Sequence, residues 1–397
     1  MIDRRLSIAW LIGVVLWLAS STLWAQSKVP AQGVGKGEIL IGSIQDLSGP
    51  IAGFGKQVRA GMMLRVDEIN EQGGIHGRKL KLLVEDSAYD PKKAVLAAQK
   101  LVNQDKIFIM VGHIGTAQNN AAMPVQFEKN VINFFPVTAA REMYEPFNRL
   151  KYSFATTYFE QMRGAVPKLV KEKGAKKVCA IYQDDEFGLE VLRGAEAGLK
   201  SMGQEMTEKT SYKRGATDFS SQVARMKAAG CDFVVMGTII RETIGTIAES
   251  RKTGFNPTFL GSSAAYTDLI HRLGGGKAMD GLYATMTVQN PYLDEASKAI
   301  SFWAAKYKTK FNEDPTVFSV YGYMAIDAFA VAANKAGNTL TADTFIAAMD
   351  TLSFAPDMFG GPPANYTPTK HLGSDVSRLS QLQDGRWKVV SEYFKAP

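Results

Sequence analysis

Short apolar runs and longer segments with apolar residues at helical spacing alternate through the first part of the chain. Residues 38–44 form a mostly apolar run, which is typical of a buried strand. A helical stripe follows, made of Phe54, Val58, Met62, Val66 and Ile69. Runs at 80–85, 107–111 and 131–135 predict three further strands, and Asp90 followed by Pro91 predicts the start of a helix.

The same alternation begins again at residue 177. Strand-like runs occupy 177–182, 205–211, 233–236 and 258–260, with helix-like stripes between them at 187–202, 219–229 and 240–253. Two successive series of strands and helices predict an α/β protein with two Rossmann-like lobes, each with a parallel central sheet covered by helices on both faces. The last third is more helical, with stripes at 295–311, 318–336 and 341–349.

The first 25 residues have a different pattern. Arg4 and Arg5 precede an apolar stretch at 6–18, and small residues lead to Ala25. The stretch is shorter than the roughly 20 apolar residues that a membrane-spanning helix needs. We therefore predict a secretory signal peptide at 1–25, although the large Leu23 leaves the cleavage point open. A retained anchor is the alternative, and the paired arginines also fit twin-arginine export.

Composition and charge exclude several classes of protein. The chain has 397 residues, of which 46% are hydrophobic and 21% charged, as in soluble globular proteins. The formal net charge is +7, but basic and acidic residues are interspersed, as at 168–173, without a basic stripe. We interpret this charge as a solvated surface and expect no nucleic-acid partner.

Residues that carry catalytic or metal chemistry are scarce. The four His share no metal-ligand spacing, and no nucleophile elbow or P-loop occurs, so we expect neither an enzyme nor a cofactor. The acidic run at 184–186 could serve acid–base chemistry, but the start of a helix explains it more simply. Cys179 and Cys231 lie in or beside apolar runs, and we expect two buried free thiols, although secretion also permits a disulfide.

Short polar segments follow three of the predicted strands, at 46–50, 113–117 and 136–139. In open α/β sheets, ligands bind at the carboxyl ends of the strands. We expect the second and third segments to lead into helices, whose first backbone N–H groups attract an anion such as a carboxylate.

Several stretches, in their order and spacing, resemble one family. They are IGSIQDLSGPIAGFG (41–55), INEQGGIHGRKLKLLVEDSAYDPKKA (69–94), VGHIGTAQ (111–118), FFPVTAA (134–140), AIYQDDEFG (180–188) and ATDFSSQVARMKAAGCDFVVMG (216–237). Over about residues 38–395 the chain is similar to the periplasmic leucine/isoleucine/valine-type binding proteins of ABC importers, which have the type I periplasmic-binding fold. The resemblance implies two lobes hinged by three crossovers, lobe 1 at 38–157 plus 288–362 and lobe 2 at 158–287 plus 363–397.

The resemblance also implies ligand contacts, several of which are changed in this chain. The family's carboxylate-binding Ser position falls on Thr116, which keeps the hydroxyl. The next two contacts fall on Val137 and Ala139, and amino-acid binders have a Thr in place of this Ala. The family's aromatic wall positions fall on Phe54, Phe187 and Ile239.

The largest departure is at Ser263. In amino-acid binders an acidic residue in this segment receives the ligand's ammonium group, and here the segment contains no carboxylate. Because a desolvated ammonium without a charged partner costs several kcal/mol, we expect a carboxylate ligand without an amino group, foremost an aromatic acid and next an aliphatic or keto acid. Asp184 or Glu242 would be a substitute carboxylate, which keeps an amino acid as the alternative.

Four other residues are expected around this pocket. Tyr158 and Tyr266 would enclose an apolar ligand, and Arg241 and His113 would add hydrogen bonds. We therefore predict a monomeric receptor in the periplasm that delivers a small carboxylate to an ABC permease and ATPase at the inner membrane. Two other classes remain open: an amidase or esterase that uses His113 beside Thr116, and a ligand-sensing module of the same fold.

Overall fold

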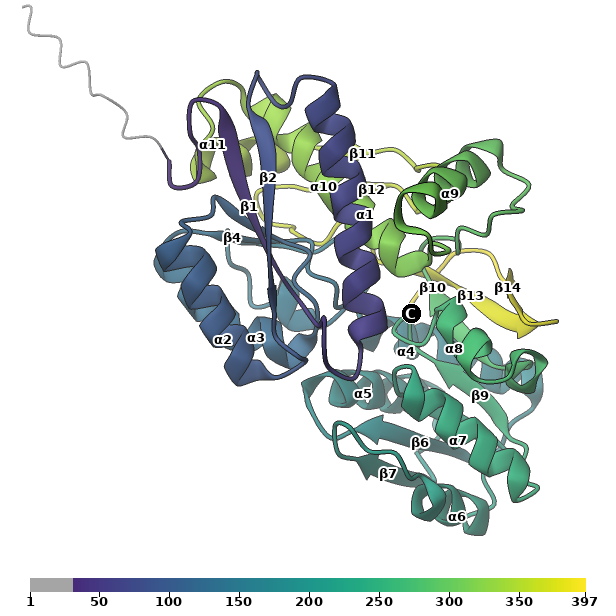
Figure 1. The fold of residues 1–397 in the computed structure, drawn as a ribbon. Helices are drawn as coiled ribbons and strands as arrows, with labels where there is room; N and C mark the ends of the chain where they lie inside the picture. The colour runs from purple at the N-terminus through teal and green to yellow at the C-terminus, as the bar shows by residue number, and fades with distance from the viewer. Residues whose placement is uncertain (1–30) are drawn as a thin grey trace, which may run out of the picture. The chain divides into compact units, whose positions relative to one another are not determined.

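Two β-sheets organise the protein, and most of their strands run parallel (Figure 1). The computed structural model describes residues 31–397, so the predicted signal peptide at 1–25 lies outside the described residues. Apolar runs form these strands because helices cover both faces of a parallel sheet, and both faces then need apolar side chains. Strand β8 (Phe233–Gly237), for example, is buried at every position.

The first sheet has the strand order β2-β1-β3-β4-β5, and every neighbouring pair is parallel. Its elements in chain order are β1 (Glu38–Gln45), α1 (Ala52–Glu71), β2 (Lys79–Asp86), α2 (Pro91–Gln99), the π-helix η1 (Lys100–Gln104), β3 (Ile109–Val111), α3 (Thr116–Glu128), β4 (Ile132–Phe134), the 3-10 helix η2 (Arg141–Met143) and β5 (Lys151–Tyr152). The predicted start of α2 is confirmed, because the Asp90 carboxylate accepts hydrogen bonds from the backbone N–H groups of Lys92 and Lys93.

The segment at 136–139 differs from its prediction. We expected it to lead into a helix, as the segment at 113–117 does at α3, but only the three-residue η2 follows it. Pro146 comes soon after η2 and cannot continue a helix, so the chain turns there instead.

The second sheet repeats the order of the first. Its parallel strands run β7-β6-β8-β9-β10, and β13 and β14 extend it by antiparallel pairing while β15 pairs with β13. Its elements besides β8 are α4 (Tyr158–Lys173), β6 (Val178–Gln183), α5 (Glu186–Ser201), β7 (Glu208–Tyr212), α6 (Ser220–Ala228), α7 (Arg241–Lys252), β9 (Thr258–Gly261), α8 (Asp268–Leu273), the 3-10 helix η3 (Gly276–Met279), β10 (Tyr283–Met286), β13 (Val376–Gln383), β14 (Arg386–Val389) and β15 (Phe394–Lys395). The two predicted series of strands and helices are thus both present.

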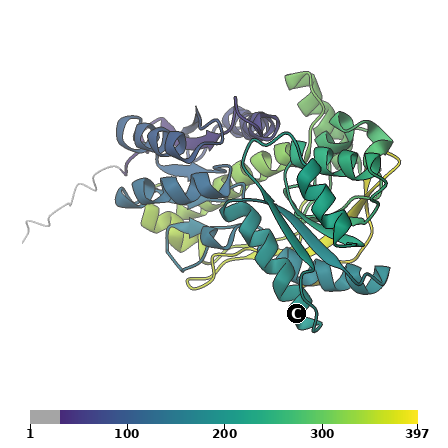
Figure 2. The same cartoon turned by 90° about the horizontal axis from the view of Figure 1, so that it is seen from below.

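The C-terminal third returns to the first sheet. It contains α9 (Lys298–Phe311), α10 (Val317–Ala336), α11 (Ala342–Met349) and the short strands β11 (Ser353–Phe354) and β12 (Ala364–Asn365). Figure 2 shows the light green α10 beside the purple and blue elements of the first sheet, where it packs on α1. By length and composition α10 could span a membrane, but 72% of its most apolar window is buried inside the protein, which is the setting of a core helix.

Two glycines allow α1 and α10 to approach each other closely. A Cβ atom at Gly61 of α1 would overlap the backbone oxygen of Ser319, and one at Gly322 of α10 would overlap the backbone oxygen of Val58. Each helix therefore lies with its backbone directly against the other, and the side chains at their ends are brought together with little freedom.

The chain passes between the two sheets at three places. Ser153 follows β5, Thr287 follows β10, and β13 begins at Val376. Leu372 forms a parallel bridge with Ser153, so this residue lies beside the first sheet. We propose that the third crossover lies at 373–375 rather than at 362–363, and we retain the other two lobe boundaries as proposals.

The expectation of two free thiols is wrong, because Cys179 and Cys231 form a disulfide. The two Cα atoms lie 5.9 Å apart. Cys179 belongs to β6, and Cys231 lies just before β8, which is the parallel neighbour of β6. Sheet order thus brings together two residues that are separated by 52 positions in the sequence.

Removing this crosslink should destabilise the protein. We expect the double variant Cys179→Ala, Cys231→Ala to lose about 2–4 kcal/mol of unfolding free energy, because the unfolded chain regains the freedom of a long loop. Urea unfolding followed by circular dichroism measures the loss. As the control, the unreduced wild-type protein should show no reactive thiol when it is unfolded, and two reactive thiols there would contradict the crosslink.

Candidate functional site

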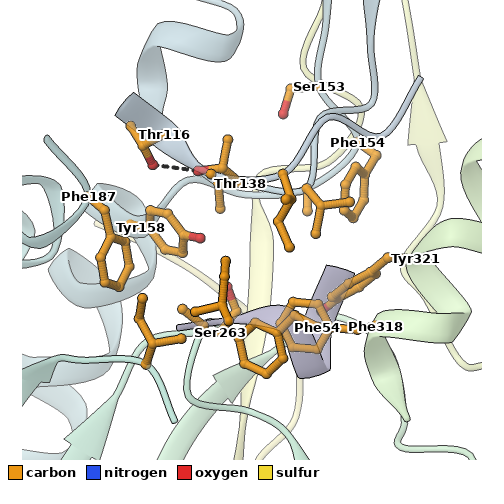
Figure 3. Close-up of a pocket in the computed structure, with 18 of the residues that line it drawn as sticks. Phe54, Thr116, Thr138, Ser153, Phe154, Tyr158, Phe187, Ser263, Phe318 and Tyr321 are labelled. Atoms are coloured by element: carbon orange, nitrogen blue, oxygen red, sulfur yellow. Dashed lines mark hydrogen bonds between the residues drawn. The ribbon is translucent and has the colours of Figure 1, made fainter. Parts of the chain in front are cut away.

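In each sheet the strand order reverses around one strand, and such reversals are where open α/β sheets bind ligands. Strand β1 lies between β2 and β3, and β6 lies between β7 and β8. Residues that follow strands of both sheets meet around one cavity of about 640 Å³, part of it open to solvent (Figure 3). Its lining is Ile51, Phe54, Tyr89, Ile114, Gly115, Thr116, Val137, Thr138, Ala139, Ser153, Phe154, Ala155, Tyr158, Phe187, Ile239, Ser263, Ala264, Thr287, Phe318 and Tyr321.

One end of the cavity is polar. Helix α3 begins there at Thr116, and no side chain caps it, because its N-cap residue is Gly115 with φ +93°. The hydroxyls of Thr116 and Thr138 lie 2.7 Å apart beside this helix start. Uncapped backbone N–H groups and two hydroxyls form a neutral site that can hold a carboxylate.

Aromatic rings form most of the remaining wall. Phe54 of α1 and Phe318 of α10 are stacked with 3.6 Å between ring centroids. Tyr158 and Phe187 meet edge to face at 5.0 Å. Figure 3 shows the pair Phe54 and Phe318 across the cavity from the two threonine hydroxyls. The cavity therefore has a polar end and a broad apolar side, as sites for amphiphilic ligands do.

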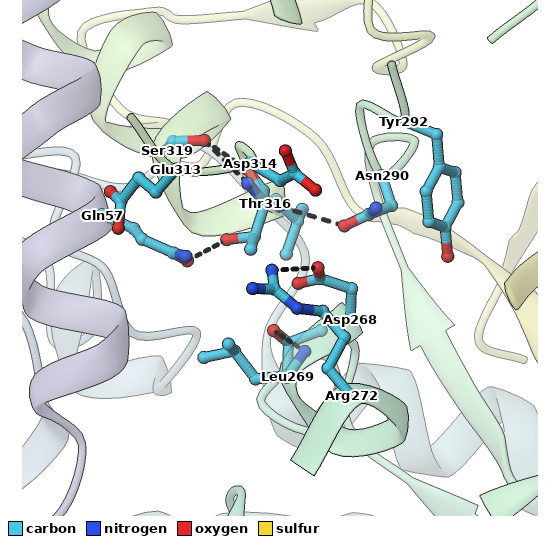
Figure 4. A network of polar contacts seen from close by, with 12 residues as sticks. Gln57, Asp268, Leu269, Arg272, Asn290, Tyr292, Glu313, Asp314, Thr316 and Ser319 are labelled. Atoms are coloured by element: carbon cyan, nitrogen blue, oxygen red, sulfur yellow. Dashed lines mark hydrogen bonds and ion pairs between the residues drawn. The ribbon is translucent and has the colours of Figure 1, made fainter. Parts of the chain in front are cut away.

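Thr316, whose contact with Gln57 is drawn in Figure 4, sets the position of Phe318. Its hydroxyl caps α10 by accepting a hydrogen bond from the Phe318 backbone N–H at 3.1 Å, and it donates to Oε1 of Gln57 on α1. The start of α10 is therefore tied to the same face of α1 that carries Phe54, which holds the two rings in their stack.

Among the described residues, the cavity lining contains no charged side chain. Asp185 is engaged elsewhere, since one of its carboxylate oxygens lies 2.6 Å from Arg214. Burial raises the pKa of Tyr158, so its hydroxyl stays neutral in the physiological range. The electrostatics of the cavity therefore come from backbone amides and hydroxyls rather than from a lysine, arginine or carboxylate.

Ser263, at the other side of the cavity, is held by Gln161 of α4. The Ser263 backbone N–H donates to Gln161 Oε1 at 2.9 Å, and the Ser263 hydroxyl accepts from Gln161 Nε2 at 3.0 Å. The same Gln161 oxygen accepts from the Thr285 hydroxyl at 2.7 Å. These uncharged hydrogen bonds surround Ser263, in the segment whose sequence contains no acidic residue.

A family model described as periplasmic binding protein matches residues 38–386. The chain belongs to the periplasmic binding protein family. Members of this family are the periplasmic substrate-binding components of ABC transporters and act as receptors rather than enzymes. The predicted family and the predicted type I fold are thereby confirmed.

One curated relative and two solved structures show what the chain is similar to. The chain is 27% identical over 319 residues to the leucine-, isoleucine-, valine-, threonine- and alanine-binding protein of Pseudomonas aeruginosa, covering 78% of this chain and 83% of that protein. A fatty acid ABC transporter substrate-binding protein from Thermomonospora curvata superposes with a TM-score of 0.83 at 23% identity, over 92% of this chain and 95% of that chain. An ABC transporter solute-binding protein from R. palustris, solved in complex with benzoate, has a TM-score of 0.78 at 18% identity, over 89% and 96% of the two chains.

Eight of the residues predicted for the site line the cavity of this binding protein, and three do not. The eight are Phe54, Thr116, Val137, Ala139, Tyr158, Phe187, Ile239 and Ser263. His113 is fully buried behind the lining, and neither ring nitrogen has a hydrogen-bond partner among the described residues. Burial lowers the pKa of His113 to about 3, so the ring is neutral. Arg241 is exposed at the start of α7.

Tyr266 is not among the residues that line the cavity. Its ring packs on Trp387 with 5.0 Å between centroids, and its hydroxyl accepts a hydrogen bond from the Asn290 backbone N–H at 2.9 Å. The side chain of Asn290 in turn accepts from the Val317 backbone N–H at the start of α10, at 3.3 Å. Tyr266 thus supports the helix that carries Phe318 instead of enclosing a ligand itself.

The two substitute carboxylates also lie outside the lining. Asp184 forms an ion pair with Lys213 at the surface. Glu242 is 3% exposed on α7, and burial raises its pKa. Neither side chain therefore supplies a charge to the cavity.

Several lining residues were missed from the sequence. Thr138 stands between two predicted contacts, and its hydroxyl could have been included on that ground alone. Phe318 and Tyr321 come from α10, and no local motif connects that helix to the first sheet. Phe154 follows β5, a strand of only two residues that the hydrophobic pattern does not reveal.

A buried carboxylate outside the cavity affects the stability of this binding protein. Asp268, at the start of α8, lies 2.9 Å from Arg272, and one of its two oxygens has no partner among the described residues (Figure 4). Burial raises the pKa of Asp268 to about 6, and the hydrogen bond from Arg272 offsets only part of this effect. Because the folded protein holds this proton more tightly than the unfolded chain, stability falls as pH rises from about 4 to 6.

Asp268→Asn should remove this pH dependence. At pH 8 we expect the variant to be more stable than wild type by about 1–3 kcal/mol, and at pH 4 the two should be equal. Urea unfolding at pH 4, 6 and 8 measures the difference. Asp384→Asn is the control, because Asp384 is exposed and pairs with the exposed Lys277. A variant that is less stable than wild type at pH 8 would contradict the prediction.

Proposed function

We propose that this protein is a periplasmic receptor that delivers an amino-free carboxylate, foremost an aromatic acid, to an ABC permease and its ATPase. The observation that carries the proposal is the neutral cavity: its described lining has no charged side chain, but one end has an uncapped helix start and two hydroxyls. Backbone N–H groups can bind a carboxylate without a buried cation. The proposal includes export through the signal peptide at 1–25 and a monomeric state.

The same cavity disfavours an amino acid. An ammonium group would be desolvated among Ser263, Gln161 and aromatic rings without an anionic partner, at a cost of several kcal/mol. Asp185 is committed to Arg214 and cannot serve without breaking that pair. Aromatic walls suit a ring instead, and the R. palustris relative solved with benzoate supports this choice of ligand.

A branched-chain amino acid is the second candidate. The curated relative from Pseudomonas aeruginosa is named for leucine, isoleucine, valine, threonine and alanine, and the carboxylate-binding end of the cavity would serve these ligands equally well. The two candidates differ in whether the Ser263 side of the cavity must accommodate an ammonium group. Experiments that change the charge at Ser263 can therefore separate them.

We further propose that the protein binds its ligand without catalysing a chemical reaction of it. An amidase or esterase would need a base beside the Thr116 hydroxyl, but that hydroxyl pairs with Thr138, and His113 is not part of the lining. A ligand-sensing role would use the same cavity and differs only in the partner.

The ligand class can be tested by binding of benzoate, phenylacetate, phenylpyruvate, leucine and glutamate. Benzoate at a hundred times its dissociation constant should stabilise the protein by about 2.7 kcal/mol, and leucine should not. Thr116→Val should weaken benzoate binding about tenfold in calorimetry, because one hydroxyl to the carboxylate is lost. The matched control is Thr246→Val, which removes a buried hydroxyl on α7 outside the cavity lining. Stabilisation by leucine and by no amino-free acid would refute the proposal.

A gain of function separates the two candidates. Ser263→Asp would place a carboxylate opposite the uncapped start of α3, where an ammonium group would find it. We expect leucine binding to become measurable and benzoate binding to weaken at least tenfold, because the new charge repels a second acid. Ser263→Asn, which has the same size and no charge, should do neither. Equal effects of the two variants on leucine and benzoate binding would contradict the electrostatic explanation.

A further inference from the structure

A second and larger cavity adjoins the first. Its volume is about 1210 Å³, of which part is open solvent, and it lies between α10 and the segment that carries β11 and β12. Four residues line both cavities, namely Phe154, Ala155, Thr287 and Tyr321. The two spaces are therefore separated by a wall one side chain thick, not by a layer of core.

Two aromatic rings form this shared wall. The ring centroids of Phe154 and Tyr321 lie 5.3 Å apart, and the two rings are tilted relative to each other. Tyr321 is buried, whereas Phe154 is only half-buried. In Figure 3 these two rings lie at the end of the first cavity that is away from Thr116. A ligand held by its carboxylate at the start of α3 thus points its other end toward this wall.

The second cavity is suited to an apolar group. Phe135, Met324, Phe354, Met358, Phe359 and Tyr366 are among its lining residues. Methionine side chains adapt their shape to different apolar partners. A flexible hydrocarbon or a ring could therefore be accommodated without a single fixed fit.

The described lining of the second cavity has no positive charge that could hold a carboxylate head group. The charged residues of its described lining are Asp327 and Asp357, and both are acidic. Asp327 forms an ion pair with Arg65 at 2.7 Å, and Asp357 accepts hydrogen bonds from the backbone N–H groups of Phe359 and Gly361. No positively charged side chain of this described lining would attract an acid, whereas the free N–H groups at the start of α3 would, and this defines the direction in which the acid lies.

We propose that the second cavity is a tail subsite, and that the preferred ligand is a carboxylate with a long unbranched apolar tail, such as an ω-phenylalkanoic acid. The head group lies at the start of α3, the chain passes Phe154 and Tyr321, and the tail lies against α10. This inference rests on the proposed function, since it takes the carboxylate site of the first cavity as given. It extends that function from a single aromatic ring to an acid that fills both cavities.

The test is a series of ω-phenylalkanoates from benzoate to 8-phenyloctanoate, measured by calorimetry on the mature protein. Once the chain passes Phe154, each added methylene should tighten binding by up to about fourfold, because it is buried in the second cavity. Two variants narrow that cavity without belonging to the first: Ala328→Phe on α10 and Ala364→Phe on β12. Both should abolish the gain for long acids. Val331→Phe is the matched control, because Val331 is 41% exposed on the same helix and lines neither cavity.

The outcomes separate this inference from the proposed function. Affinity that rises with chain length in wild type and Val331→Phe, but not in the narrowed variants, supports the tail subsite. Benzoate binding with no gain for longer acids overturns the subsite and leaves the proposed function standing. No binding of any acid, short or long, overturns both. Melting curves identify a narrowed variant that does not fold, and the other variant then decides.

Discussion

The close contact between α1 and α10 is the constraint on which the binding region depends. Gly61 and Gly322 let the two helix backbones touch, and Thr316 then reaches Gln57 to tie the start of α10 to α1. This contact stacks Phe318 on Phe54 in the first cavity. It also aligns α10 so that the residues after Phe318 line the second cavity. A helix from the C-terminal third thereby becomes one wall of both spaces.

In the proposed site, backbone N–H groups rather than ionised side chains would bind the negative charge of the ligand. An arginine or lysine in a closed cavity would itself have to be desolvated, whereas the N–H groups at the start of α3 are already part of the fold and need an acceptor. Gly115 provides no capping side chain, so these groups remain free for a ligand. Asp185 and Arg214 neutralise each other next to the cavity, so their charges have little effect on a ligand's choice. In the function that we propose, this neutral lining would favour an anionic ligand over a cationic one.

Local patterns in the sequence predicted the strands and helices well, because apolar runs, helical stripes and caps such as Asp90 act over a few residues. The resemblance to the binding-protein family, rather than local pattern, identified eight lining residues, all from segments that follow strands or begin helices. The features that the sequence did not predict depend on the order of strands in the sheets and on contacts between segments that are far apart in the sequence. The disulfide required knowing that β6 and β8 are neighbours, and Phe318 required knowing that α10 packs on α1. Tyr266 was assigned to the pocket for its aromatic character, and only its contact with Asn290 reveals a supporting role.

The function that we propose divides ligand binding between the two ends of the cavity. Backbone groups and hydroxyls at the start of α3 would hold the carboxylate of any acid. In the function that we propose, the rest of the lining selects the ligand: Ser263 would determine whether an ammonium group has a partner, and Phe154 and Tyr321 would determine how long the ligand can be. Changes at these few positions leave the sheets and the contact between α1 and α10 intact. Ligand class can therefore change without a change in fold.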